Sequence, residues 1–479
     1  MSLSRIRPPL LKLRITIFSA FGVVRSQALP PRKPSLQENL LSYESRNYNF
    51  ATLPRFVSPE AFGEAMAMNV LRRGFDLEKF SELRDDIIAI SEKGVREWLS
   101  KRTPEQVKGL LSDLENPLEL EQEITRFKLM VKRDAKVKLD SSCLNKHPPA
   151  QNIMFHRKAI NAIYSPMFDE FKNRVIHCLK KNIFFFTEMP NSTLAKIAQN
   201  VLGTEDVYHV GEIDFSKYDK SQDAFIKAFE RVLYAEFGFD PELLSIWMEG
   251  EVYSEATTLD GQMSFSIDNQ RKSGASNTWI GNTVVTLGIL SLYYRVDELT
   301  ALFVSGDDSL MYSTRPIDSF ADDICRDLGF ETKFMSPSVP YFCSKFMVQA
   351  GHKVFFVPDP YKLVVKLGSI KTDFSVSFLH EVFTSFRDLT ADYGDERVCE
   401  KLAELVSRKY STESGNIMLA ILSIHCIRSN FLSFLKLFPR VTGWKILYGR
   451  LYQWVYKNPL LNYFKFKTPS GDAFFVWHE

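Results

Sequence analysis

Two apolar runs flank a short polar turn in the stretch ALFVSGDDSLMY, residues 301–312. This pattern predicts a β-hairpin whose four-residue turn, SGDD, carries Asp307 and Asp308 at its tip. Adjacent carboxylates repel each other, so the pair needs solvent or a cation close by. Glycine and aspartate are also common turn formers, and this hairpin alone is therefore a weak indication of a site.

A further aspartate stands at the end of an earlier predicted strand. The alternation in VYHVGEIDF sets Asp214 out of phase with its apolar neighbours Ile213 and Phe215. Asp219 follows in DFSKYDKSQ, just before the helix predicted for SQDAFIKAFERVLYAEFGF. The alternative is that Asp219 or Ser221 caps this helix and that the charges are solvated.

The strand-end DxxxxD and the hairpin GDD are far more informative together than apart. Two neighbouring strands of one sheet can bring Asp214 and Asp307 to the same place. Mg²⁺ prefers carboxylate oxygens, and two ions about 3.5–4 Å apart can activate a 3′-hydroxyl and neutralise a departing pyrophosphate. The pairing therefore predicts a two-Mg²⁺ nucleotidyl-transfer site, in which Mn²⁺ can substitute.

A third polar stretch, QRKSGASNTWIGNT, lies between the two acidic ones. Ser273 begins a predicted flexible turn, and Thr278 and Asn282 would share one face of a helix that begins near Thr278. Asn282 could then bond a ribose hydroxyl with Asp219 as its partner, which is one way for a site to select ribonucleotides. Helix capping by the preceding SNT residues is the competing explanation and needs no ligand.

In this order and spacing, DFSKYDKSQ, QRKSGASNTWIGNT and SGDDSL resemble motifs A, B and C of viral RNA-dependent RNA polymerases. The residues of these motifs are most similar to those of the alphavirus-like supergroup of positive-strand RNA plant viruses. The sequence as a whole resembles a closterovirus polymerase. MVKRDAKVKLD resembles the basic motif F of that group, DLGFETKF its motif D and YFCSKFMV its motif E. HRKAINAIYSPMF and DPYKLVVKLG are similar as well, so the resemblance covers about residues 125–370.

The resemblance implies a role for each matching residue. Asp214 and Asp307 would bind metal with Asp308 assisting, and Lys333 would protonate the leaving pyrophosphate. The residues implied in substrate binding are the ribose-selecting pair Asp219 and Asn282, their supports Ser273 and Thr278, and the basic residues Lys132, Arg133, Lys136, Lys138 and Arg271. An exposed basic strand facing template phosphates is the alternative for the motif F residues, and Arg271 could serve either purpose.

The fold implied by the resemblance is α+β, a right-hand polymerase with fingers, palm and thumb. Its palm would be built on an antiparallel sheet similar to that of an RNA-recognition motif. We expect four parts in chain order: a basic, partly ordered leader over residues 1–45, an N-terminal extension and fingers with motif F over 46–205, a palm with motifs A to E and an inserted part of the fingers over 206–370, and a helical thumb over 371–479.

Composition limits the class of protein without identifying it. The 479 residues are 45% hydrophobic and 25% charged, as in soluble globular proteins with several lobes. The net charge is only +2, so a surface that binds RNA must be local. The 6 cysteines lie far apart without a CxxC, which indicates free thiols in a reducing compartment. No stretch is long and apolar enough to span a bilayer.

The resemblance also implies partners and a location. The substrates would be an RNA template with its product strand and ribonucleoside triphosphates. No methyltransferase or helicase signature is present, so a viral methyltransferase/helicase replicase protein is the expected partner. The expected location is the host cytoplasm, in membrane-associated replication complexes that the chain would join indirectly.

Two other functions compete with this interpretation. A reverse transcriptase shares the palm and the two metals, but it usually carries a bulky side chain where Asp219 stands. A non-enzymatic RNA-binding scaffold would carry degenerate motifs, whereas none of the catalytic motifs here departs from the expected pattern.

Overall fold

The computed structural model describes residues 16–17, 24–25, 34–48, 57–83, 85–132, 149–203, 208–368, 375–411, 414–435 and 437. The chain divides into two compact units, Arg32–Cys343 and Ser344–Glu479 together with Met1–Pro31. The described cysteines are all free thiols, in agreement with the prediction. Among the described helices, none combines the length and the apolarity needed to cross a membrane.

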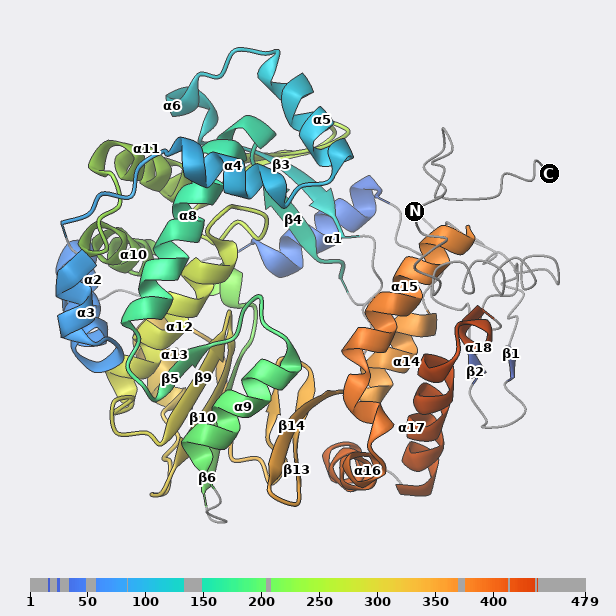
Figure 1. Ribbon diagram of the computed structural model, residues 1–479. Helices are drawn as coiled ribbons and strands as arrows, with labels where there is room; N and C mark the ends of the chain where they lie inside the picture. Colours follow the sequence, from blue (N-terminus) through green and yellow to red (C-terminus); the bar gives the residue numbers. More distant parts are fainter. Residues whose placement is uncertain are drawn as a thin grey trace, which may run out of the picture. The chain divides into compact units, whose positions relative to one another are not determined.

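A five-stranded sheet lies in the Arg32–Cys343 unit, in its lower half in the view of Figure 1. Its strands, in order across the sheet, are β11 (Thr332–Met335), β6 (His209–Phe215), β10 (Asp308–Ser313), β9 (Ala301–Ser305) and β5 (Ile183–Phe185). The first four strands pair antiparallel, as predicted for the palm. The edge strand β5 instead pairs parallel to β9, so the sheet is mixed and not wholly antiparallel.

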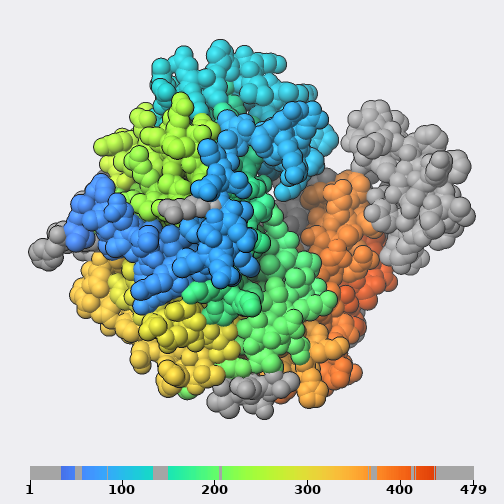
Figure 2. Space-filling model, turned by 60° about the vertical axis from the view of Figure 1, so that its left-hand side comes forward, coloured from blue at the N-terminus to red at the C-terminus, as the bar shows by residue number. Residues whose placement is uncertain are grey.

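The helix that begins in the stretch QRKSGASNTWIGNT packs against this sheet. Helix α12 (Thr278–Tyr293) begins at the predicted residue and is apolar around most of its circumference, which suits a helix covered on all sides. It contacts β9 and the N-terminal helix α2 (Pro59–Gly74). Figure 2 shows the surface that covers this core from one side, with the N-terminal helices in blue.

Helix α10 (Ala224–Glu236) crosses α2 at close range. Gly63 permits this crossing, because a Cβ there would lie 2.6 Å from the carbonyl carbon of Ala228 on α10. Asp223 caps α10 by accepting from the backbone N–H groups of Phe225 and Ile226 at 3.1 and 3.2 Å. The predicted caps Asp219 and Ser221 lie instead in the preceding 3₁₀ turn η1 (Tyr218–Ser221).

A second sheet lies in the same unit. In order across it, the strands are β4 (Asn152–Phe155), β3 (Arg126–Val131), β7 (Tyr253–Thr258) and β8 (Ser264–Asp268). The helices of the unit not yet named are α1 (Leu36–Arg46), α3 (Leu77–Leu83), α4 (Glu92–Ser100), α5 (Pro104–Leu114), α6 (Leu120–Glu123), α8 (Lys158–Cys178), α9 (Asn191–Leu202), α11 (Pro241–Val252) and α13 (Ala321–Leu328), and β12 (Tyr341–Phe342) ends it. Helix α1 contacts β3 and β4, and it includes the last part of the predicted leader.

The other unit is mainly helical after an initial hairpin. The hairpin consists of β13 (Lys345–Ala350) and β14 (Lys353–Pro358), which pair antiparallel. Its remaining elements are β1 (Thr16–Ile17), β2 (Val24–Arg25), α14 (Pro360–Gly368), α15 (Val376–Leu389), η2 (Ala391–Gly394), α16 (Glu396–Tyr410), α17 (Ser414–Ser429) and α18 (Phe431–Leu435). Mixed helices and sheets in the two units confirm the α+β class.

Candidate active site

Charged side chains line up across three neighbouring strands at one end of the five-stranded sheet. Asp214 is exposed near the end of β6 while Ile213 and Phe215 are buried, as the alternation predicted. Lys333 on β11 pairs directly with Asp214. On the other side Ser309 pairs with Ile213, so one further step of the same register places Asp308 beside Asp214. Residues opposite each other in adjacent strands project to the same face, and the three therefore form one row.

The hairpin between β9 and β10 carries Asp307 in a tighter turn than predicted. Asp308 pairs with Ser305, which leaves only Gly306 and Asp307 as turn residues, not the four of SGDD. Gly306 has a φ of 63°, and two-residue hairpins of type II′ carry glycine at this first position. The short turn fixes the backbone of Asp307 beside the charged row.

Two threonines of α12 hold this turn, and the sequence interpretation missed both. The Gly306 N–H donates to Thr283 Oγ1 at 2.9 Å, and Thr286 Oγ1 donates to the Gly306 carbonyl at 2.8 Å. Thr286 Oγ1 also bonds the hydroxyl of Tyr218 at 2.8 Å. Residues of the stretches that resemble motifs A, B and C are therefore connected through one short chain of hydrogen bonds.

The electrostatics of Asp307 show that the carboxylates share one environment. Asp307 is exposed at the hairpin tip, yet its carboxyl group is surrounded closely enough that partial desolvation is the main cause raising its pKa to about 6. The negative charge of Asp308 contributes next, and Asp219 and Asp214 add smaller amounts in the same direction. A cation at this place would relieve both effects.

These residues fit a Mg²⁺ site of the kind completed by a substrate. Among the described residues, no group of three or more acidic, histidine or cysteine side chains converges to enclose an ion. Mg²⁺ is commonly held by one or two carboxylates together with water and substrate phosphates, so a full protein cage is not required. Asp214, Asp307 and Asp308 supply carboxylates of this kind at one sheet end.

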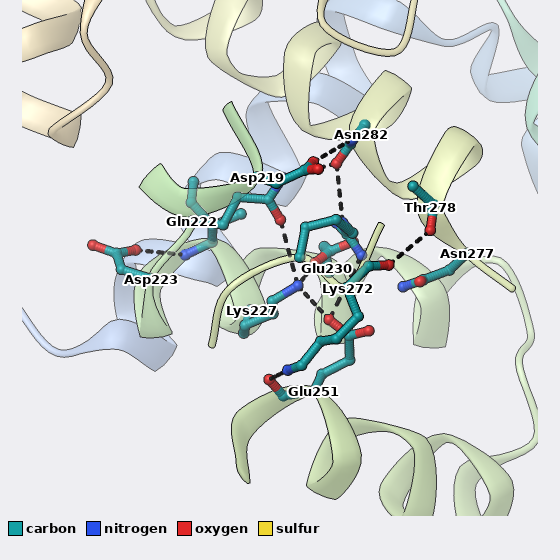
Figure 3. A network of polar contacts seen from close by, with 12 residues as sticks. Asp219, Gln222, Asp223, Lys227, Glu230, Glu251, Lys272, Asn277, Thr278 and Asn282 are labelled. Atoms are coloured by element: carbon teal, nitrogen blue, oxygen red, sulfur yellow. Dashed lines mark hydrogen bonds and ion pairs between the residues drawn. The ribbon is translucent and has the colours of Figure 1, made fainter. Parts of the chain in front are cut away.

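The two residues predicted to select the ribose bond each other. The Asn282 amide Nδ2 donates to Asp219 Oδ1 at 2.9 Å (Figure 3). Burial raises the pKa of Asp219, although the hydrogen bond from Asn282 and the positive charges of Arg271, Lys227 and Arg46 act in the opposite direction. Asp219 therefore lies at the border between the exposed row and the protein interior.

Ser273 and Thr278 organise the loop that precedes α12. Ser273 Oγ donates to the Asn152 carbonyl at 3.0 Å. Thr278 Oγ1 donates to the carbonyls of Lys272 and Ala275 at 2.9 and 2.7 Å. The predicted capping side chain Asn277 makes no cap hydrogen bond. The hydroxyls of Ser273 and Thr278 thus donate to backbone carbonyls, and they support the site by fixing the conformation of the loop.

The predicted role of Arg271 in substrate binding, whether at the triphosphate or at template phosphates, disagrees with its buried position. Arg271 is 1% exposed, and its guanidinium forms an ion pair and hydrogen bond with the buried carboxylate of Glu230. Its neighbour Lys272 is 0% exposed and donates to the Glu251 carbonyl at 2.7 Å. Both side chains lie in the interior, where the buried glutamates Glu230 and Glu251 attract them.

Of the predicted basic residues in the motif F stretch, only Lys132 is described. It is exposed at the end of β3, and its backbone N–H donates to the Gln151 carbonyl at 2.6 Å. Arg133, Lys136 and Lys138 lie outside the described residues.

The chain is similar to known viral proteins over most of its length. A family model described as RNA dependent RNA polymerase matches residues 19–437. The Replicase polyprotein 1ab of Beet yellows virus is 66% identical over 455 residues, 95% of this chain and 15% of that protein. The polyprotein of the same name from Grapevine leafroll-associated virus 3 is 34% identical over 418 residues, 87% of this chain and 15% of that protein. A Methyltransferase/helicase/RNA-directed RNA polymerase of Raspberry bushy dwarf virus is 28% identical over 414 residues, 86% of this chain. The chain thus spans 15% of the length of each of the first two relatives.

Proposed function

The chain belongs to the RNA-dependent RNA polymerase family of plant positive-strand RNA viruses, and on that basis we propose that it replicates and transcribes a viral RNA genome. The reaction is nucleotidyl transfer: the 3′-hydroxyl of the growing RNA attacks the α-phosphate of a ribonucleoside triphosphate and pyrophosphate leaves. The observation that carries this proposal is the charged row at the sheet end, which adjoins the Asp219–Asn282 pair.

Asp214 and Asp307 are proposed to hold the divalent cations, with Asp308 assisting from the start of β10. When bound, two Mg²⁺ ions, or Mn²⁺ in their place, would activate the attacking oxygen and neutralise the leaving one. Thr283 and Thr286 keep the Gly306 turn, and with it Asp307, in one position while substrates exchange. Preorganised carboxylates of this kind avoid a reorganisation cost during the reaction.

Lys333 is proposed to donate a proton to the leaving pyrophosphate. It is exposed and faces the same side of the sheet as Asp214, its partner across the strands. A protonated amine in this position neutralises charge that develops on the leaving group, which is the task of a general acid. The basic residues Lys132, Arg133, Lys136 and Lys138 are proposed to grip the triphosphate.

Asp219 and Asn282 are proposed to recognise the ribose 2′-hydroxyl. Asn282 donates to Asp219 with one amide hydrogen and keeps a second hydrogen for a ligand. A small acidic residue at position 219 leaves room for the 2′-hydroxyl, which a reverse transcriptase would exclude. The site therefore supports ribonucleotide polymerisation over deoxyribonucleotide polymerisation.

The wider assembly follows the resemblance and the named relatives. We propose that the central sheet is a palm and that the helical unit after it contains a thumb, with RNA held between fingers and palm. The relative from Raspberry bushy dwarf virus, whose name combines a methyltransferase, a helicase and a polymerase, supports a methyltransferase/helicase partner. Indirect attachment to host cytoplasmic membranes is proposed through that partner.

Template-dependent incorporation by the purified full chain tests the function. With a primed RNA template, ribonucleotides and Mg²⁺, we expect extension that stops at the template end and vanishes in Asp307→Ala. RNA binding should be largely kept, because Lys and Arg contacts to phosphates supply most nonspecific affinity. Equal extension by Asp307→Ala, or preference for deoxyribonucleotides, would overturn the proposal.

A further inference from the structure

Five ionisable side chains are buried together beneath the ribose-selecting pair (Figure 3). Lys227, Glu230, Glu251 and Arg271 are each 1% exposed and Lys272 is 0% exposed. Removing charges from water is costly, and well-packed apolar side chains of the same size often give equal or greater stability. The cluster therefore calls for an explanation other than stability, and its contacts lead directly to Asn282.

The Asn282 side chain receives two donors on its oxygen. Gln222 Nε2 donates to Asn282 Oδ1 at 2.8 Å, and Arg271 Nε donates to the same oxygen at 3.0 Å. An amide oxygen has two lone pairs, so both are used. If the amide were rotated by half a turn, its NH₂ group would face these two donors and its oxygen would face the carboxylate of Asp219. The two donors thus select the orientation in which Nδ2 bonds Asp219 at 2.9 Å.

The cluster fixes each of these donors in turn. Gln222 could itself present either end of its amide, but Lys227 Nζ donates to Gln222 Oε1 at 3.4 Å and so leaves the Nε2 group for Asn282. Lysine has donors only, which makes this choice one-sided. Lys227 is held by Glu230 at 2.9 Å and by Glu251.

Arg271 is held in the same manner and touches both members of the pair. Its guanidinium pairs with Glu230 and lies 3.6 Å from Glu251. Its backbone N–H donates to the Asp219 carbonyl at 3.1 Å, while its side chain bonds Asn282. Tyr234 completes the support by donating from its hydroxyl to Glu230 at 2.7 Å.

We propose that Gln222 and Arg271 are positioning residues for sugar selection, which hold the Asn282 amide so that its NH₂ group faces Asp219 and the ribose 2′-hydroxyl. The inference rests on the proposed polymerase function and deepens it. Neither residue contacts the nucleotide. The buried cluster sets the discrimination between ribose and deoxyribose by removing the alternative orientation of one amide.

The test measures kcat/KM for a ribonucleotide and for the matching deoxyribonucleotide in primer extension. Gln222→Met keeps the size of the side chain, removes one donor and breaks no ion pair. The loss of one hydrogen bond to Asn282 should lower the ratio of the two kcat/KM values about three- to tenfold. In an Asn282→Ala background, Gln222→Met should leave the ratio unchanged, because its effect passes through Asn282.

A matched control separates positioning from general destabilisation. Arg174, also buried, donates to Glu170 at 2.9 Å and to the Asp86 carbonyl at 2.6 Å, away from Asn282. Arg174→Lys should lower the melting temperature and leave the sugar ratio at the wild-type value. If the wild type extends the primer, the polymerase function holds. An unchanged ratio of the two kcat/KM values in Gln222→Met, or an equal change of this ratio in Arg174→Lys, would then overturn the inference alone. Absence of extension by the wild type would instead overturn the proposed function and the inference with it.

Discussion

Two groups of charged side chains lie close together in the Arg32–Cys343 unit. They differ in whether the protein itself supplies the opposite charge. At the sheet end, Asp307 is exposed, yet partial desolvation of its carboxyl group together with the neighbouring carboxylates raises its pKa to about 6. In the buried cluster, burial alone would raise the pKa of Glu251, but Lys227 and Arg271 lower it to about 2. The first group gains from an incoming cation, whereas the second is already balanced by the protein. The contrast suggests that one group performs chemistry and the other fixes its geometry.

The largest expected effect separates activity from stability at the sheet end. Asp214→Asn should slow nucleotide incorporation about a thousandfold or more, because it removes a ligand from the proposed metal site. The melting temperature should stay the same or rise, since repulsion among the carboxylates falls. Rapid-quench primer extension and thermal unfolding measure the two quantities, and a lower melting temperature with unchanged rate would reverse the contrast.

The matching change in the buried cluster should act on stability. Glu230→Gln removes one carboxylate from Lys227 and Arg271 and leaves buried positive charge uncompensated. We expect a loss of about 3–5 kcal/mol in the free energy of unfolding. Urea unfolding followed by tryptophan fluorescence measures it, with Glu92→Gln on the exposed pair Glu92–Arg96 as a control. A loss as small as that of the control would show that the cluster is not a balanced unit.

Lys272 gives the cluster a pH dependence. Burial lowers the pKa of Lys272 to about 7 from its ordinary value of 10.5. Between these values the unfolded chain binds more protons than the folded chain, so the free energy of unfolding rises with pH, by up to about 1.4 kcal/mol per pH unit. Urea unfolding of the wild type and Lys272→Met between about pH 7.5 and about pH 9 should show this rise only in the wild type. If the free energy of unfolding rose equally with pH in both proteins, the Lys272 amine would not be buried as described.

The smallest expected effect concerns Lys333. Among the described residues no ion pair joins Lys333 to Asp214, although the two face each other across the strands. Lys333→Met should therefore change the free energy of unfolding by less than about 0.5 kcal/mol. Lys227→Met, the same substitution in the buried cluster, is the matched comparison and should cost several times more by chemical denaturation. Similar changes in the free energy of unfolding for the two variants would show that the sheet end and the buried cluster do not differ in their contribution to stability.

The sequence predicted the exposed group better than the buried one. Asp214 lies where alternation places it, Asp307 lies at the tip of the predicted hairpin although the turn is shorter than expected, and α12 begins at Thr278 as expected. No role for Glu230 follows from the motifs, although it falls four residues after Ile226 and three before Leu233, on the buried face of α10. That position was a usable signal. Its pairing with Arg271 was not, because the contact depends on a loop conformation 41 residues further along.

The sheet shows the same limit. Its antiparallel strands come from the stretches that resemble motifs A, C and D, and the strands of A and C have a clear apolar pattern. The parallel edge strand β5 comes from Ile183–Phe185, which the resemblance assigned to the fingers region. A short apolar run such as this does not specify its own neighbour, since β pairing is decided by packing in the whole sheet.

Binding of Mn²⁺ tests whether the carboxylates at the end of the five-stranded sheet hold divalent cations, and it does not depend on turnover. Electron paramagnetic resonance of the full chain with primed RNA and a non-hydrolysable ribonucleotide would count bound Mn²⁺. We expect the wild type and Gln222→Met to bind Mn²⁺ alike, whereas Asp307→Asn should lose at least one ion. Equal binding of Mn²⁺ by Asp307→Asn and the wild type would show that Asp307 holds no metal.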